Sequence, residues 1–199
     1  MSNDRTAIKF CFEVDPFEID AYHFQVNYST QVRLVEMTSN SSLNDVGLFV
    51  GSLLAFNNLS FNSEFFNALF KEEELALVGG LLFEQNNQLI GASCCADFQD
   101  WSLVVDGIKK KSSPWMGHSP SPWFEFEDEN IILWSENEVI ENAYSINFTQ
   151  HEFDKQLLQA KQELKHFAKK IEVWAAENCY TDCNNFLNGI KHYLLFEKT

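Results

Sequence analysis

The sequence lacks any Lys or Arg between Lys111 and Lys155, although these 43 residues include nine Asp or Glu. A block of one sign destabilises the compact state through self-repulsion, so it indicates a surface kept acidic for a basic partner, or simply for solubility. Over all 199 residues the formal net charge is −15. Because nucleic-acid affinity comes mainly from Lys and Arg, this charge predicts no binding to nucleic acid, and anionic membranes are poor partners as well.

Long apolar stretches are also missing, since none approaches the roughly 20 residues that a membrane-spanning helix needs. The first six residues lack the charged-then-apolar architecture of a secretory signal. We therefore expect a cytoplasmic protein without membrane contact. The five Cys form an odd count, and reduced thiols are expected in that compartment.

The common catalytic signatures are absent too. The sequence contains no G-x-S-x-G elbow, phosphate-binding glycine loop, H-E-x-x-H or G-x-G-x-x-G. The spacing of Cys94-Cys95 and Cys179-x-x-x-Cys183 differs from that of zinc knuckles. His118 is close to two serines but is more simply a turn residue than a catalytic base. We expect no enzyme activity, no metal and no cofactor.

Apolar residues are plentiful: 45% of the chain is hydrophobic, and 19 residues are Phe. That supply suffices for a core without a metal or disulfide framework. No repeat, linker or low-complexity tract divides the chain, so we expect one globular domain over residues 1–199. The patterns described next predict an α+β fold, with a mainly antiparallel sheet packed by a long C-terminal helix and a short closing helix.

Alternating apolar residues predict strands at residues 8–14, 24–28 and 31–37, with Val32 and Leu34 sharing one face of the last strand. Two hairpins are predicted, one across residues 75–95 with its turn at 85–87, and one across residues 123–134 with its turn at 128–130. In the second hairpin Phe124 and Phe126 point one way, while Trp123, Glu125 and Glu127 point the other. A further strand is predicted at residues 101–105, ended by Asp106-Gly107.

Helical patterns fill the remaining segments. Residues 46–56 are interpreted as a buried helix, although a buried strand has a similar pattern. Ser63 is the expected cap of a second helix that passes through Phe70 and ends in Glu72-Glu73-Glu74. The clearest helix runs from residue 150 to about residue 178, begun by a Thr149/Glu152 capping box and a Phe148/Phe153 staple. Its apolar stripe is Phe153, Leu157, Ala160, Leu164, Phe167, Ile171 and Trp174. Packing inside the protein is favoured for this stripe over a coiled-coil dimer seam. Residues 183–195 are predicted to form the closing helix.

Two resemblances follow from these features. The block from Gly117 to Phe126, followed by Ile131 to Ser135 and the capped helix, resembles segments of small uncharacterised bacterial proteins, which implies no particular activity. As a small, acidic domain rich in aromatic residues, the chain also resembles the immunity proteins that neutralise toxins of polymorphic or contact-dependent inhibition systems. This second resemblance is one of character and has no diagnostic motif.

The resemblance to immunity proteins implies a monomer that binds a basic toxin domain through aromatic anchors and acidic side chains. The candidate partner-binding residues all lie in the stretch without Lys or Arg: Trp115, His118, Trp123, Glu125, Glu127, Asp128, Glu129, Glu136, Glu138 and Glu141. One alternative is a small-molecule-binding domain or small enzyme with a pocket between sheet and long helix. Another is a structural protein that self-associates through the helix stripe.

Overall fold

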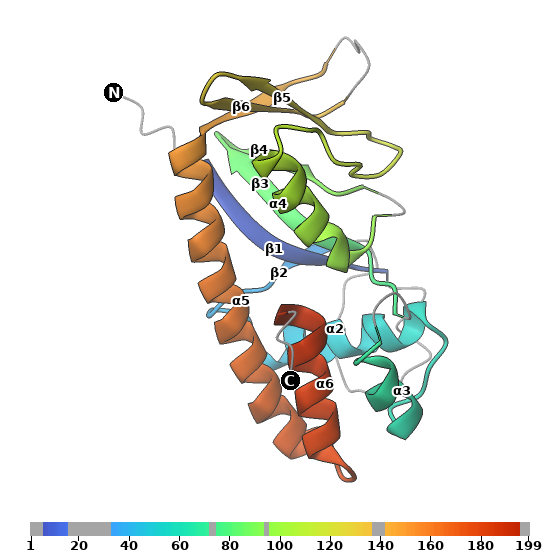
Figure 1. The fold of residues 1–199 in the computed structure, drawn as a ribbon. Coiled ribbons are helices and arrows are strands. Elements are labelled where there is room, and N and C mark those ends of the chain that lie inside the picture. The colour runs from blue at the N-terminus through green and yellow to red at the C-terminus, as the bar shows by residue number, and fades with distance from the viewer. Residues whose placement is uncertain (1–5, 16–32, 72–74, 94–95, 137–141, 196–199) are drawn as a thin grey trace. The chain divides into compact units, whose positions relative to one another are not determined.

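The computed structural model describes residues 6–15, 33–71, 75–93, 96–136 and 142–195 (Figure 1). The chain forms two compact units: unit 1 comprises Met1–Cys11 and Val78–Lys161, and unit 2 comprises Phe12–Leu77 and Gln162–Thr199. Strand β1 (Thr6–Val14) and helix α5 (Gln150–Asn178) each contribute residues to both units. The predicted α+β class is confirmed. The expectation of a single domain stays a prediction.

The strands within the described ranges form two sheets, a four-stranded one of order β2-β1-β3-β4 and a three-stranded one of order β5-β6-β7. In unit 1, β3 (Gly79–Gln85) and β4 (Gln88–Gly91) make an antiparallel hairpin. Its turn residues Asn86 and Asn87 have φ of 51° and 65°, a left-handed conformation that Asn tolerates better than most residues. The hairpin predicted across residues 75–95 is therefore confirmed within the described part of that range.

The second predicted hairpin is also present in unit 1, as β5 (Trp123–Glu127) and β6 (Asn130–Trp134), and β7 (Ser145–Thr149) pairs antiparallel with β6. Phe83 of β3 joins this sheet to the hairpin β3–β4, because its ring centroid lies 5.8 Å from that of Phe124 and 5.8 Å from that of Phe148. Unit 1 thus has an aromatic core under the β5–β6–β7 sheet.

The strand predicted at residues 101–105 is wrong. This segment is helix α4 (Trp101–Lys109), preceded by the short 3-10 turn η1 (Phe98–Asp100). Asp97 caps η1 in a capping box with Asp100, which starts a helical turn. The buried residues of α4 are Trp101, Val104, Val105 and Ile108. Their spacing of three to four residues is typical of a helix and differs from the alternation of a strand. A Cβ at Gly107 would lie 2.8 Å from the Ser112 carbonyl oxygen, so this glycine allows close packing of the next loop rather than ending a strand.

Unit 2 contains β2 (Arg33–Glu36) and the helices α2 (Leu43–Phe56), α3 (Ser63–Ala68) and α6 (Cys183–Leu195). Figure 1 shows α6 beside the C-terminal half of α5, which belongs to the same unit. The helix interpretation of residues 46–56 is confirmed, and so is the closing helix. The expected cap of the second helix is wrong, because the Asn62 side chain, not that of Ser63, accepts from the Glu64 and Phe65 amides.

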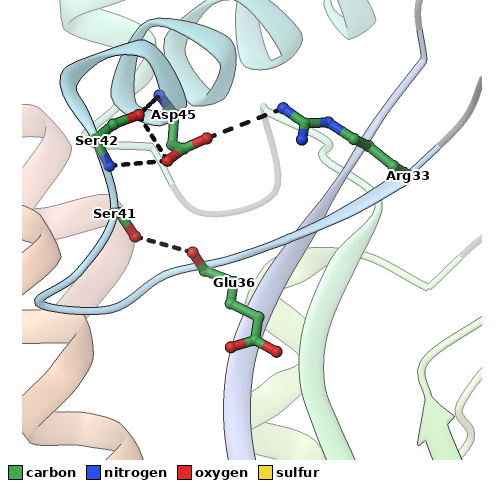
Figure 2. A network of polar contacts seen from close by, with 5 residues as sticks. All are labelled: Arg33, Glu36, Ser41, Ser42 and Asp45. Atoms are coloured by element: carbon green, nitrogen blue, oxygen red, sulfur yellow. Dashed lines mark hydrogen bonds and ion pairs between the residues drawn. The ribbon is translucent and has the colours of Figure 1, made fainter. Parts of the chain in front are cut away.

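In β2, Val35 is 6% exposed and Leu34 is 45% exposed, so Val35 is on the buried face of this strand. Val32 and the strand predicted at residues 24–28 lie outside the described residues. Figure 2 shows what fixes the link from β2 to α2: the Ser42 amide and hydroxyl donate to the Asp45 carboxylate at 2.8 Å each. Arg33 lies 3.9 Å from the same carboxylate.

Helix α5 begins and ends where the sequence predicts. The Glu152 amide donates to the Thr149 hydroxyl at 3.2 Å, and the Thr149 amide donates to the Glu152 carboxylate at 2.9 Å, which completes the capping box. All seven residues of the predicted stripe are buried. In unit 1 Phe153 packs on Phe148 with ring centroids 6.3 Å apart, and in unit 2 Phe167 packs on Phe49 at 5.7 Å. The stripe therefore supplies core residues in each unit, as the intramolecular interpretation predicts.

Candidate functional site

The acidic residues of the β5–β6 hairpin lie on one face of the three-stranded sheet. Residues paired across antiparallel strands share a face, and successive residues alternate between faces. Phe124 pairs with Leu133, which pairs with Ile146, and these three are at most 2% exposed, so they define the inner face. The opposite face, here called the outer face, carries Trp123, Glu125 and Glu127 of β5, Asn130, Ile132 and Trp134 of β6, and Ser145, Asn147 and Thr149 of β7.

On the outer face, Trp123 and Trp134 are directly opposite each other. The Trp134 indole Nε1 donates a hydrogen bond to the Glu125 carboxylate at 3.0 Å. This bond fixes the carboxylate beside the two indoles while both partners remain partly exposed. The outer face therefore combines aromatic surface with an oriented negative charge, which suits contact with a cationic group.

The hairpin turn extends this surface with Glu127, Asp128 and Glu129, whose side chains are exposed. The turn is held through its backbone, because the Asp128 carbonyl accepts from Lys111 Nζ at 2.7 Å and the Glu129 carbonyl accepts from the Gln150 amide at 2.9 Å. Lys111 thus brings one positive charge to the turn, which reduces the local negative charge but leaves three exposed carboxylates.

Glu136 is held in place from two sides, just after β6. The Ser121 amide lies 3.2 Å from each oxygen of its carboxylate, and the Trp123 indole Nε1 donates to its backbone carbonyl at 3.2 Å. Glu136 lines a pocket of about 250 Å³. The other lining residues within the described ranges are Leu89, Ile90, Gly91, Pro120, Pro122, Ser135, Asn142, Ala143 and Tyr144, which belong to unit 1 and lie outside α5.

Trp115 and His118 lie on the loop that precedes β5. Their rings meet edge to face with centroids 5.3 Å apart, and Trp115 is 51% exposed. The loop is anchored by Met116, which is buried and whose carbonyl accepts from the Ser93 amide at 2.9 Å. Trp115 borders a small crevice with Asp97 and Asp100, whereas Trp123 is bonded to Glu136 at the larger pocket.

The structure thus places the predicted residues in four groups. Trp123, Glu125 and Glu127 share the outer face, Asp128 and Glu129 form its turn, Glu136 lines the pocket, and Trp115 and His118 lie on the loop before β5. Glu138 and Glu141 lie outside the described residues. The prediction missed Trp134 and Tyr144. The hairpin register, with its turn at residues 128–130, would have placed Trp134 opposite Trp123, but no local pattern marks Tyr144.

Two of the described cysteines, Cys179 and Cys183, are linked by a hydrogen bond. The Cys183 thiol donates to the Cys179 carbonyl at 2.6 Å. Burial is the main cause that raises the pKa of the Cys179 thiol to about 12, which disfavours the nucleophilic thiolate. Cys94 and Cys95 lie outside the described residues. Within the described ranges no three His, Cys, Asp or Glu side chains gather in a way that would hold a metal ion.

No family model, curated protein or solved structure matches this chain. Among the helices in the described ranges, even the 29-residue α5 lacks an apolar stretch sufficient to cross a membrane.

Proposed function

We propose that this chain is an acidic protein-binding module that docks a basic protein through the outer face of the β5–β6–β7 sheet and its turn. The observation that carries the proposal is the gathering of Glu125, Glu127, Asp128 and Glu129 with Trp123 and Trp134 on this one surface. The finer proposal is an immunity protein that neutralises a basic toxin domain. It is supported by the acidic, aromatic-rich character of the chain.

The physical argument has two parts. A net charge of −15 attracts a basic partner over distances comparable to the Debye length, about 8 Å at physiological salt, and raises the association rate. Partly buried Trp side chains then supply contact area from which water is excluded, and such residues dominate the free energy of many interfaces. The hydrogen bond between Trp134 and Glu125 orients both kinds of group before binding.

The test is binding to the C-terminal domain of the protein encoded beside this chain's gene, measured by surface plasmon resonance between 50 and 500 mM NaCl. We expect the association rate to fall steeply with salt. Reversing the turn charges in a Glu127→Lys, Asp128→Lys, Glu129→Lys variant should lower the association rate about tenfold or more at low salt.

The matched control carries the same change in net charge elsewhere: Asp106→Lys, Glu172→Lys, Glu177→Lys, three exposed helix positions. The two variants have equal net charge, so any difference between them reports the location of the charge. Equal effects of both variants, or association that is independent of salt, would contradict a docking surface on the hairpin.

A further inference from the structure

The pocket beside Glu136 has the size and chemistry for one long cationic side chain. Pockets that take drug-sized ligands occupy about 300–1000 Å³. This one is smaller, at about 250 Å³, and its walls are mainly apolar or aromatic, including Pro120, Pro122, Leu89 and Tyr144. Among the described residues of the lining, Glu136 is the only charged one. An apolar slot with one carboxylate matches a side chain with an apolar stem and a positive head.

The walls of the pocket are fixed by hydrogen bonds between segments far apart in the sequence. The Tyr144 hydroxyl donates to the Leu89 carbonyl at 2.6 Å, which ties the segment just before β7 to β4. The Ser135 amide donates to the Tyr144 carbonyl at 2.9 Å, and the Tyr144 amide donates to the Ser135 hydroxyl at 3.1 Å. The pocket is therefore built before any partner arrives, which lowers the entropic cost of binding.

We propose that this pocket receives an arginine side chain of the basic partner, an inference that rests on the proposed function. Guanidinium is favoured over ammonium because its planar group stacks on an aromatic ring such as that of Tyr144, and because its five N–H donors lie in one fixed plane. The Ser121 amide lies 3.2 Å from each oxygen of the Glu136 carboxylate and holds it in place. The arginine is thus an anchor, and the acidic outer face supplies long-range attraction.

The experiment is an NMR titration of the ¹⁵N-labelled chain with Nα-acetyl-L-arginine methylamide. Its neutral, nearly isosteric citrulline analogue is the control probe. We expect saturable shifts at Gly91, the Ser121 amide, Tyr144 and the Trp123 indole, and no saturation with citrulline. Shifts centred on Asp128 and Glu129 instead, shifts without saturation, or equal binding of citrulline would overturn the proposal.

The matched variants are Glu136→Gln, which removes the pocket charge, and Glu127→Gln, which removes an exposed hairpin charge outside the lining. Glu136→Gln should weaken the arginine probe by at least about tenfold, the effect of a charge-assisted hydrogen bond, and Glu127→Gln by less than about twofold. Ala143→Phe, which places a bulky ring at another lining position and leaves residue 136 unchanged, should also abolish saturation. If either pocket variant is too unstable for a dispersed spectrum, the other decides.

The two proposals fail separately. If charge reversal at residues 127–129 slows docking of the basic protein but Glu136→Gln binds arginine like the wild type, the pocket assignment is wrong and the docking surface stands. If the arginine probe saturates in the pocket but no basic protein binds with salt-dependent kinetics, the proposed function is wrong. The pocket would then be a site for free guanidinium compounds.

Discussion

The indole of Trp134 and the carboxylate of Glu125 are joined by a hydrogen bond of 3.0 Å across the β5–β6 hairpin. Trp134→Phe keeps an aromatic ring but deletes the donor. We expect the free energy of unfolding to fall by about 1 kcal/mol, as measured by urea denaturation. Glu125→Gln keeps an acceptor oxygen and should have a smaller effect. An unchanged urea midpoint in Trp134→Phe would show that the bond makes no net contribution.

The capping box at the start of α5 gives a second prediction. Thr149→Ala removes the hydroxyl that accepts from the Glu152 amide and should lower the free energy of unfolding by about 1 kcal/mol. Thr181, at an exposed turn after the helix, is the matched control, and Thr181→Ala should stay within about 0.5 kcal/mol of the wild type. Equal urea midpoints for the two variants would contradict the capping role.

A third prediction concerns acid stability. The Ser39 amide donates to the Glu163 carboxylate at 2.6 Å, and this hydrogen bond holds the pKa of Glu163 below its ordinary value of 4.5. A carboxyl whose pKa is lowered by folding stabilises the protein above its unfolded pKa, and this contribution is lost as the pH falls through the folded pKa.

We therefore expect Glu163→Gln to be less stable than the wild type at pH 7 and to lose less stability than the wild type below pH 4.5. The measurement is the urea midpoint as a function of pH. Glu177→Gln, at an exposed position of the same helix, should retain the wild-type slope. A wild-type slope in Glu163→Gln would show that another group governs the acid response.

Helix α5 and the two hairpins were predictable because their signals are local. The Thr149/Glu152 box, the stripe of α5 and the alternation in β5 and β6 each lie within a short window of sequence, and the structure agrees with them. In β2, a strand of only four residues, Leu34 and Val35 are both apolar, so alternation alone does not decide which of the two is buried.

The candidate site was predictable only in part. The acidic outer face follows from hairpin register, which the turn at residues 128–130 largely sets. The pocket does not, because it depends on two hydrogen bonds across the chain: from the Tyr144 hydroxyl to the Leu89 carbonyl, and from the Ser121 amide to Glu136. Each of these hydrogen bonds joins residues that no local sequence pattern marks. Tertiary contacts of this kind leave no periodic trace in a single sequence.

Two buried helical glycines of unit 2 should respond oppositely to a methyl group. A Cβ at Gly51 in α2 would meet no atom within 4 Å beyond its own helix backbone and chain neighbours, whereas a Cβ at Gly189 in α6 would lie 2.8 Å from Leu69 Cβ. Gly51→Ala should raise the free energy of unfolding by about 0.5–1 kcal/mol, because Ala loses less backbone entropy in a helix. Gly189→Ala should lower it by about 1–3 kcal/mol through overpacking. Urea denaturation of both variants checks the pair, and a shift of the same sign in both would contradict the packing described for α2 and α6.

The role of Tyr144 in the pocket can be separated into its ring and its hydroxyl. Tyr144→Phe deletes only the bond to the Leu89 carbonyl and keeps the aromatic wall, so the arginine probe should still saturate. Tyr144→Ala also removes the ring. Stacking of a cation on an exposed ring contributes about 0.5–1 kcal/mol, so affinity should fall roughly twofold to fivefold beyond the effect of Tyr144→Phe. The NMR titration measures both. If Tyr144→Phe and Tyr144→Ala bind the probe equally, the ring does not contact the guanidinium, and recognition would depend on Glu136 alone.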